Sequence, residues 1–102
     1  MARYKMVAFS NAVEGRDEDF NQWYDQQHIK DVLAIPGVVS AERFTCVGEG
    51  AQKYMAIYEV ETDDLSAVMA ELGKRPGTDV MPISDAVDFS SGSVGFWQPY
   101  AK

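Results

Sequence analysis

The Pro36-Gly37 pair constrains the fold of this chain more than any other feature, because it ends the longest helical pattern in the sequence. Proline lacks an N–H and disfavours helical geometry in the residue before it, while glycine allows the chain to reverse. At the other end, Asp17 is expected to cap the helix, and further carboxylates follow in the first turn. The sequence therefore predicts a helix from Asp17 or Glu18 to Ala34 or Ile35.

Strands are predicted on both sides of this helix. The segment from Tyr4 to Ser10 is a nearly continuous apolar run, which is typical of a central strand that is buried on both faces. Two later runs are separated by a glycine-rich turn and predict an antiparallel hairpin: Val38 to Cys46 or Val47, and Lys53 to Glu61. A last, aromatic-rich strand is predicted from Val94 to Gln98 or Tyr100, and Pro99 limits it to an edge position.

A second helix is predicted after the hairpin. Thr62 is expected to be its N-cap, Gly73 is expected to close it, and four apolar residues recur at helical spacing to form a core stripe: Leu65, Val68, Met69 and Leu72. The segment from Lys74 to Ser93 is rich in Pro, Ser, Gly and Asp, and we expect an ordered connection with at most one short helical turn.

The resulting order is β-α-β-β-α-β, which predicts the α+β class and a split βαβ arrangement. This arrangement is a four-stranded antiparallel sheet with both helices on one face. The other face is left uncovered although the strands are apolar on both sides. A second copy of the chain is the simplest cover, so the sequence predicts a homodimer, with residues 1–102 forming one domain in each subunit.

Composition excludes several classes of partner and site. The net charge of -7 argues against nucleic acid and against anionic membranes, and no apolar run approaches the length of a membrane span. One His and one Cys are too few for a structural zinc site, and no phosphate-binding glycine motif occurs, so we expect no metal and no tightly held cofactor. Cys46 has no disulfide partner and the N-terminal residues lack a signal-peptide pattern, which favours the cytoplasm.

The segment from Phe20 to Phe44 has a more specific character. It reads Phe-x-x-Trp-Tyr-Asp-x-x-His-x-x-Asp-Val-Leu-x-Ile-Pro-Gly-Val, followed by Ser-Ala-Glu-Arg-Phe, and it resembles the EthD-like branch of the dimeric α/β-barrel superfamily. Members of that branch carry a His in an aromatic-rich first helix, shortly before a Pro-Gly turn. The resemblance implies a ferredoxin-like fold whose dimer closes two sheets into a barrel, with a ligand cavity in each subunit. The superfamily includes cofactor-free oxygenases, cyclases, isomerases and haem-degrading enzymes, so the fold does not fix the reaction.

The first helix also carries the residues that are best suited to proton transfer. His28 is the only histidine, and its side chain is the one whose ordinary pKa lies near neutrality. In an α-helix Tyr24 lies about 40° from it, and Asp31 lies one turn further on. We predict that His28 is a general base or acid, that Asp31 orients its ring, and that Tyr24 steadies a developing oxyanion. The alternatives are that His28 is an imidazole at the surface or at the edge of the core, that Asp31 is an ordinary surface carboxylate, and that the Tyr24 ring only anchors the helix.

Four further residues are predicted to contact a ligand: Trp23, Gln27, Arg43 and Tyr58. Trp23 fits either the core or a pocket wall, and Arg43 either binds an oxygen of the ligand or forms a surface pair with Glu42 or Glu59. Tyr58, like Tyr54, Phe96 and Trp97, suits an aromatic ligand or a dimer core.

Two functions follow from these residues. The first is a small cofactor-independent enzyme of isomerase, cyclase or oxygenase type, which acts by proton transfer on an apolar aromatic or polyketide-like molecule. The alternative is a non-catalytic protein that binds a hydrophobic small molecule, haem included, since imidazole is a common haem ligand.

Overall fold

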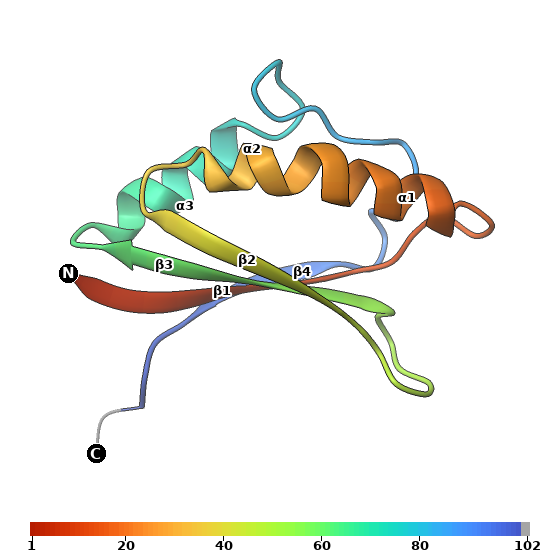
Figure 1. The fold of residues 1–102 in the computed structure, drawn as a ribbon, viewed down its shortest axis with the longest axis horizontal. Coiled ribbons are helices and arrows are strands. Elements are labelled where there is room, and N and C mark those ends of the chain that lie inside the picture. Colours follow the sequence, from red (N-terminus) through yellow and green to blue (C-terminus); the bar gives the residue numbers. More distant parts are fainter. Residues whose placement is uncertain (101–102) are drawn as a thin grey trace.

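The computed structural model describes residues 1–100 and contains one four-stranded antiparallel sheet (Figure 1). The elements follow the order expected from the sequence, with one helical segment between β1 and β2 and another between β3 and β4. Their bounds are β1 (Ala2–Ser10), α1 (Asp17–Trp23), a π-helical segment η1 (Tyr24–His28), α2 (Ile29–Leu33), β2 (Val38–Thr45), β3 (Tyr54–Thr62), α3 (Leu65–Lys74) and β4 (Ser93–Trp97). The strand order is β2-β3-β1-β4, so the ferredoxin-like α+β fold is confirmed.

The strands agree with the sequence-based expectation to within a few residues. β2 and β3 form the expected antiparallel hairpin, β1 lies in the sheet centre between β3 and β4, and β4 is an edge strand that ends before Pro99. The segment between α3 and β4 contains turns and no helix, and a single bridge joins Ala12 to Val87. No helix in residues 1–100 is long and apolar enough to cross a membrane.

The residues that begin, cap and end the helices differ from those expected. Asp17 is the first helical residue and not the N-cap, because its carboxylate is bound instead by side chains of the β2–β3 hairpin. Asp64, and not Thr62, caps α3 by accepting from the Ala67 N–H at 3.3 Å, while the Thr62 hydroxyl accepts from Asp64 N–H. Gly73 lies inside α3, which continues to Lys74.

Gly37 is required by the turn that follows the first helix. Its φ of 101° lies in the left-handed region, which glycine adopts without steric cost. A Cβ at this position would lie 3.2 Å from Cγ2 of Val68, on α3. The Pro-Gly pair therefore sets both the reversal of the chain and the close approach of this turn to the second helix.

The two faces of the sheet differ in composition. Alternate strand residues face the helices and form the core together with buried residues of the helices and connections. The largest fully buried side chains of this core are Tyr58, Phe20, Ile35, Met81, Val32, Val60 and Val68. Figure 1 shows the helices on one side of the sheet and no element on the other. The open side carries an apolar group in its centre, which we call the sheet patch: Val7, Phe9, Phe44, Met55 and Ile57. Phe9 and Phe44 are each 37% exposed, so the expected burial of β1 on both faces is not achieved within one chain.

Candidate functional site

The site is organised by the π-helical segment η1 in the middle of the first helix. Phe20, Tyr24, His28 and Val32 are four residues apart, and three of them are buried against the sheet while His28 is half-buried. In a regular α-helix the 12 residues from Phe20 to Val32 would leave the two side chains about 120° apart. The wider π-helical turn compensates for this drift. A four-residue repeat can therefore stay on one face.

The same turn places Trp23 against His28. These residues are five apart, which would separate them by about 140° in an α-helix, but here their rings stack with centroids 4.6 Å apart. The edge of the Tyr24 ring meets His28 as well, at 4.8 Å between centroids. Two aromatic rings thus hold the imidazole in one orientation.

The His28 ring forms part of the wall of the space between helix and sheet. Its Nδ1 atom is buried and has no hydrogen-bond partner among the described residues. Burial is the main reason that the pKa of His28 falls to about 4; the charge of Asp31 opposes this shift and that of Arg43 adds to it. The imidazole is therefore neutral at pH 7, and any contact between a ring nitrogen and a ligand is left to Nε2.

Tyr24 and Tyr58 form a buried hydroxyl pair beside His28. Their oxygens lie 2.8 Å apart, so one hydroxyl donates to the other. Burial raises the pKa of both residues above the ordinary value for tyrosine, and for Tyr58 the neighbouring Tyr24 raises it further. Both phenols stay protonated at neutral pH. They can supply a hydrogen bond to an oxygen of a ligand without carrying charge themselves.

Asp31 does not orient His28 through a hydrogen bond. Both of its carboxylate oxygens accept from Nε2 of Gln27, at 2.9 and 3.1 Å. Gln27 itself borders a shallow surface depression with Asp19 and Gln22. The structure thus places Gln27 and Asp31 together, but neither lines the space that His28 faces; Asp31 acts on His28 only through its charge.

Arg43 lies on the opposite side of Tyr24 from this space. Its guanidinium carbon is 4.3 Å from the centre of the Tyr24 ring, and it donates to Asn21 at 2.8 Å and to Asp25 at 2.9 Å. The expected surface pair with Glu42 or Glu59 does not form, because the Arg43 side chain turns towards the helix and only 16% of it is exposed.

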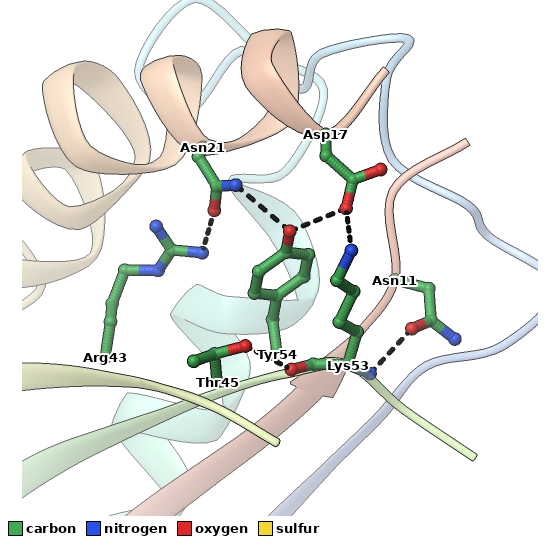
Figure 2. Close-up of polar contacts among 7 residues, drawn as sticks. All are labelled: Asn11, Asp17, Asn21, Arg43, Thr45, Lys53 and Tyr54. Atoms are coloured by element: carbon green, nitrogen blue, oxygen red, sulfur yellow. Dashed lines mark hydrogen bonds and ion pairs between the residues drawn. The ribbon is translucent and has the colours of Figure 1, made fainter. Parts of the chain in front are cut away.

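Arg43 belongs to a polar network between the first helix and the hairpin, which we call the hairpin network (Figure 2). Its centre is the Tyr54 hydroxyl, which donates to Asp17 at 2.6 Å and accepts from Asn21 at 3.1 Å. Lys53 also binds Asp17, at 2.9 Å. The sequence analysis missed this network, although Asp17, Asn21 and Asp25 recur every four residues and so form a polar stripe on one helix face.

Two chambers open between the helices and the β1–β4 side of the sheet. The first has a volume of about 570 Å³ and is lined mainly by apolar side chains, among them Met6, Val32, Tyr58, Met69, Leu72 and Met81. The second, of about 410 Å³, is lined by Ser10, Phe20, Trp23, Ile83, Val87 and Asp88, among others. Both chambers include Ala8, Tyr24, His28 and Val94. Met69, expected to lie in the core, is 49% exposed and lines the first chamber.

The connection from α3 to β4 covers the second chamber. It is fixed by the Val13 N–H, which donates to the carbonyl of Ala86 at 2.7 Å, and by the indole N–H of Trp23, which donates to the carbonyl of Pro82 at 3.2 Å. Trp23 is thus a chamber wall, a support for His28 and an anchor for this connection. Within residues 1–100, no three His, Cys, Asp or Glu side chains gather in a way that could hold a metal ion.

Comparison with known proteins shows the fold of this chain. No protein-family model matches it, and no curated protein matches its sequence. Solved structures that share its fold include a proposed antibiotic biosynthesis monooxygenase from Bordetella bronchiseptica, with 18% identity, a TM-score of 0.65 and coverage of 99% of this chain and 100% of the other. An EthD family protein from Bacillus halodurans has 14% identity, a TM-score of 0.58 and coverage of 96% and 99%.

A third structure with this fold is a MhuD variant with two manganese protoporphyrin IX molecules bound per active site. It shares 14% identity with the chain, at a TM-score of 0.58 and coverage of 98% and 96%. At these identities the likeness is one of fold. The resemblance to EthD-like proteins that the segment from Phe20 to Phe44 suggested is therefore confirmed at the level of the fold.

Proposed function

We propose that the chain is a cofactor-independent enzyme that removes or adds a proton on an apolar aromatic or polyketide-like molecule. The observation that carries this proposal is the His28 ring, which stacks on Trp23 and meets Tyr24 edge-on at the point where the two chambers adjoin. A neutral imidazole beside a pair of protonated phenols is the combination that general base catalysis with oxyanion stabilisation requires.

The proposed step moves one proton and one electron pair. A ring nitrogen of His28 takes a proton from a C–H or O–H group next to a carbonyl, and the electron pair of the broken bond shifts to the substrate oxygen. Tyr24, itself bonded to Tyr58, donates a hydrogen bond to that oxygen. The low pKa of His28 makes it a weak base in the empty site, but the negative charge that develops on the substrate would favour the imidazolium ion.

Proton exchange on anthrone tests this proposal without knowledge of the final product. Isomerisation, cyclisation and cofactor-free oxygenation all begin with proton removal, so the enzyme should speed deuterium incorporation at the anthrone methylene in D2O under anaerobic conditions. His28→Gln should lower this rate about 100-fold or more, with an unchanged circular dichroism spectrum. Equal rates in the two proteins would contradict the proposed role of His28.

The pH dependence of the exchange rate gives a second test. Because the pKa of His28 is lowered to about 4, the base is already deprotonated at neutral pH. The rate constant should be level between about pH 5.5 and 8 after correction for the uncatalysed reaction, and should fall below about pH 4.5. A limb near pH 6.5 would mean that the imidazole is exposed to solvent in the working enzyme.

A non-catalytic binding protein is the second candidate, favoured by the apolar lining of the first chamber. Haem is less well supported as its ligand, although MhuD binds a porphyrin in the same fold. Porphyrin carboxylates call for cationic partners, and no Lys or Arg among the described residues lines either chamber. This candidate predicts binding of hydrophobic ligands with no exchange above the buffer rate.

We further infer that the working form is a homodimer in which a second copy covers the sheet patch. The patch is apolar, while the end of the same face is closed by the exposed pairs Lys5–Glu59 and Arg3–Glu61. Light scattering should give twice the mass of the chain. Phe44→Lys, within the patch, should halve it, whereas Val47→Lys in the exposed hairpin should not; a monomeric unaltered protein would contradict this inference.

A further inference from the structure

The two chambers lie end to end along the sheet. On β1 the first chamber reaches Met6, both reach Ala8 and the second reaches Ser10. The other two elements give the same order: Phe96 then Val94 on β4, and Val32, then His28, then Phe20 on the first helix. Since three elements agree, the two chambers lie in line with His28 and Tyr24 at their junction, and we call the pair of chambers the trough.

The length of this trough exceeds one aromatic ring. The four residue steps from Met6 to Ser10 on β1 correspond to about 13 Å. The two ends differ in character: three methionines, Met6, Met69 and Met81, line the first chamber, and their flexible side chains adapt to irregular apolar shapes. The second chamber has aromatic walls and polar atoms from Ser10 and Asp88.

The charge of the trough selects against anions. Among the described residues it has no cationic lining, and its one charged lining residue is Asp88, at the rim of the second chamber. The Asp88 carboxylate accepts from the Ser90 N–H at 2.9 Å and from the Ser90 hydroxyl at 2.6 Å, which holds it in place. A carboxylate can accept from a ligand hydroxyl but repels a ligand carboxylate.

We propose that one elongated, uncharged molecule fills both chambers at once, with the group that reacts at the junction between His28 and Tyr24. Its class is a fused-ring or polyketide-type phenol or ketone, with an apolar end against the methionines and a hydroxylated end near Asp88. This inference rests on the proposed function for the reaction, but its binding test does not require turnover.

The test of charge compares two three-ring probes, a dihydroxyanthraquinone and the same compound with one added carboxylate. Quenching of tryptophan fluorescence reports binding, because Trp23 lines the second chamber. The neutral probe should bind at least about 10-fold more tightly, and Asp88→Asn should narrow that ratio. Equal affinity of the two probes, or no binding of either, would overturn the proposal.

The test of length blocks one chamber at a time. A Cβ on Gly73, which borders the first chamber, meets no other atom within 4 Å, so Gly73→Phe adds a ring without a backbone clash. Val87→Phe adds a ring to the wall of the second chamber, and Gly73→Ala and Val87→Ile are the matched controls. Each Phe variant should lower the affinity for the neutral three-ring probe about 10-fold or more, while each control changes it less than about 2-fold.

A one-ring probe, hydroxyacetophenone, separates the two ways in which this account can fail. It fits in a single chamber, so at least one Phe variant should leave its affinity unchanged. If either Phe variant binds the three-ring probe as the unaltered protein does, the end-to-end arrangement is wrong, whatever the result of proton exchange. If both variants lose binding but anthrone exchange is absent, the trough stands and the proposed chemistry fails.

Discussion

The two sides of Tyr24 contain opposite kinds of polar structure. On the side of the β2–β3 hairpin, the network contains charged groups, and each of its principal members has a partner: Asp17, Asn21, Arg43 and Tyr54. On the other side, His28, Tyr24 and Tyr58 are uncharged and line the first chamber, and Nδ1 of His28 has no hydrogen-bond partner among residues 1–100. Buried polar atoms in folded proteins are usually paired, so an unpaired one marks a place where stability has been given up. The network therefore fixes the first helix to the hairpin, and the unpaired atom beside the chambers supports the proposal that they take a ligand.

The largest effect that tests this contrast is expected in the stability of the fold at acid pH. The pKa of His28 is about 4 in the folded chain and ordinarily 6.5, so between these values the unfolded chain binds more protons and folding weakens as the pH falls. The free energy of unfolding is therefore not reduced by His28 above about pH 6.5, and it is about 3 kcal/mol lower by about pH 4. Urea unfolding should show that His28→Gln loses less stability than the unaltered protein across this range. The same acid loss in both proteins would show that the imidazole is not desolvated.

Removal of the cation from the hairpin network should have the next largest effect. Arg43→Met leaves Asn21 and Asp25 without their donor and removes the contact with the Tyr24 ring, which should cost about 2 kcal/mol. Arg3→Met is the matched control, since the Arg3 side chain is largely exposed and its pair with Glu61 is long; it should cost less than about 0.5 kcal/mol. Equal effects in urea unfolding would mean that the network contributes little.

The smallest test compares one hydroxyl from each side. Tyr54→Phe removes a bond to a carboxylate and a bond from Asn21, and should cost about 1.5 kcal/mol. Tyr58→Phe removes only the neutral bond to Tyr24 and should cost about 1 kcal/mol or less. The order should reverse in the exchange assay, where Tyr58→Phe lowers the rate more. A larger rate loss with Tyr54→Phe would place the reaction on the side of the hairpin network and would contradict the proposed site.

Sequence patterns predicted the fold because its elements are local. The Pro36-Gly37 stop, the hairpin glycines and the runs and helical spacing of apolar residues each act within a few positions, and the strand bounds agree to within a few residues. The sequence did not predict the role of Asp17 at the start of the first helix. Its carboxylate is bound by Tyr54 and Lys53, which are distant in sequence. A local capping rule cannot include such partners.

The candidate site was predicted in its residues more than in its geometry. His28, Tyr24, Trp23 and Tyr58 do lie together around the trough. The prediction assumed 100° per residue, but the π-helical turn at Tyr24–His28 brings Trp23 against His28, a contact that a regular α-helix would not make. Asp31 pairs with Gln27 at the ordinary i,i+4 spacing of a helix. Tertiary packing of the four-residue repeat stabilises such a π-helical turn, and the sequence of the helix alone does not predict it.

The protonation state of His28 tests the proposed site most directly, and it is easy to observe in this chain. His28 is the only histidine, so an NMR titration of the imidazole reports a single residue without assignment. We predict ring signals that do not move between about pH 5.5 and 8 and a midpoint near the lowered pKa of about 4. A midpoint near 6.5 would contradict the central claim, since it would place the imidazole in water and not in the wall of the trough.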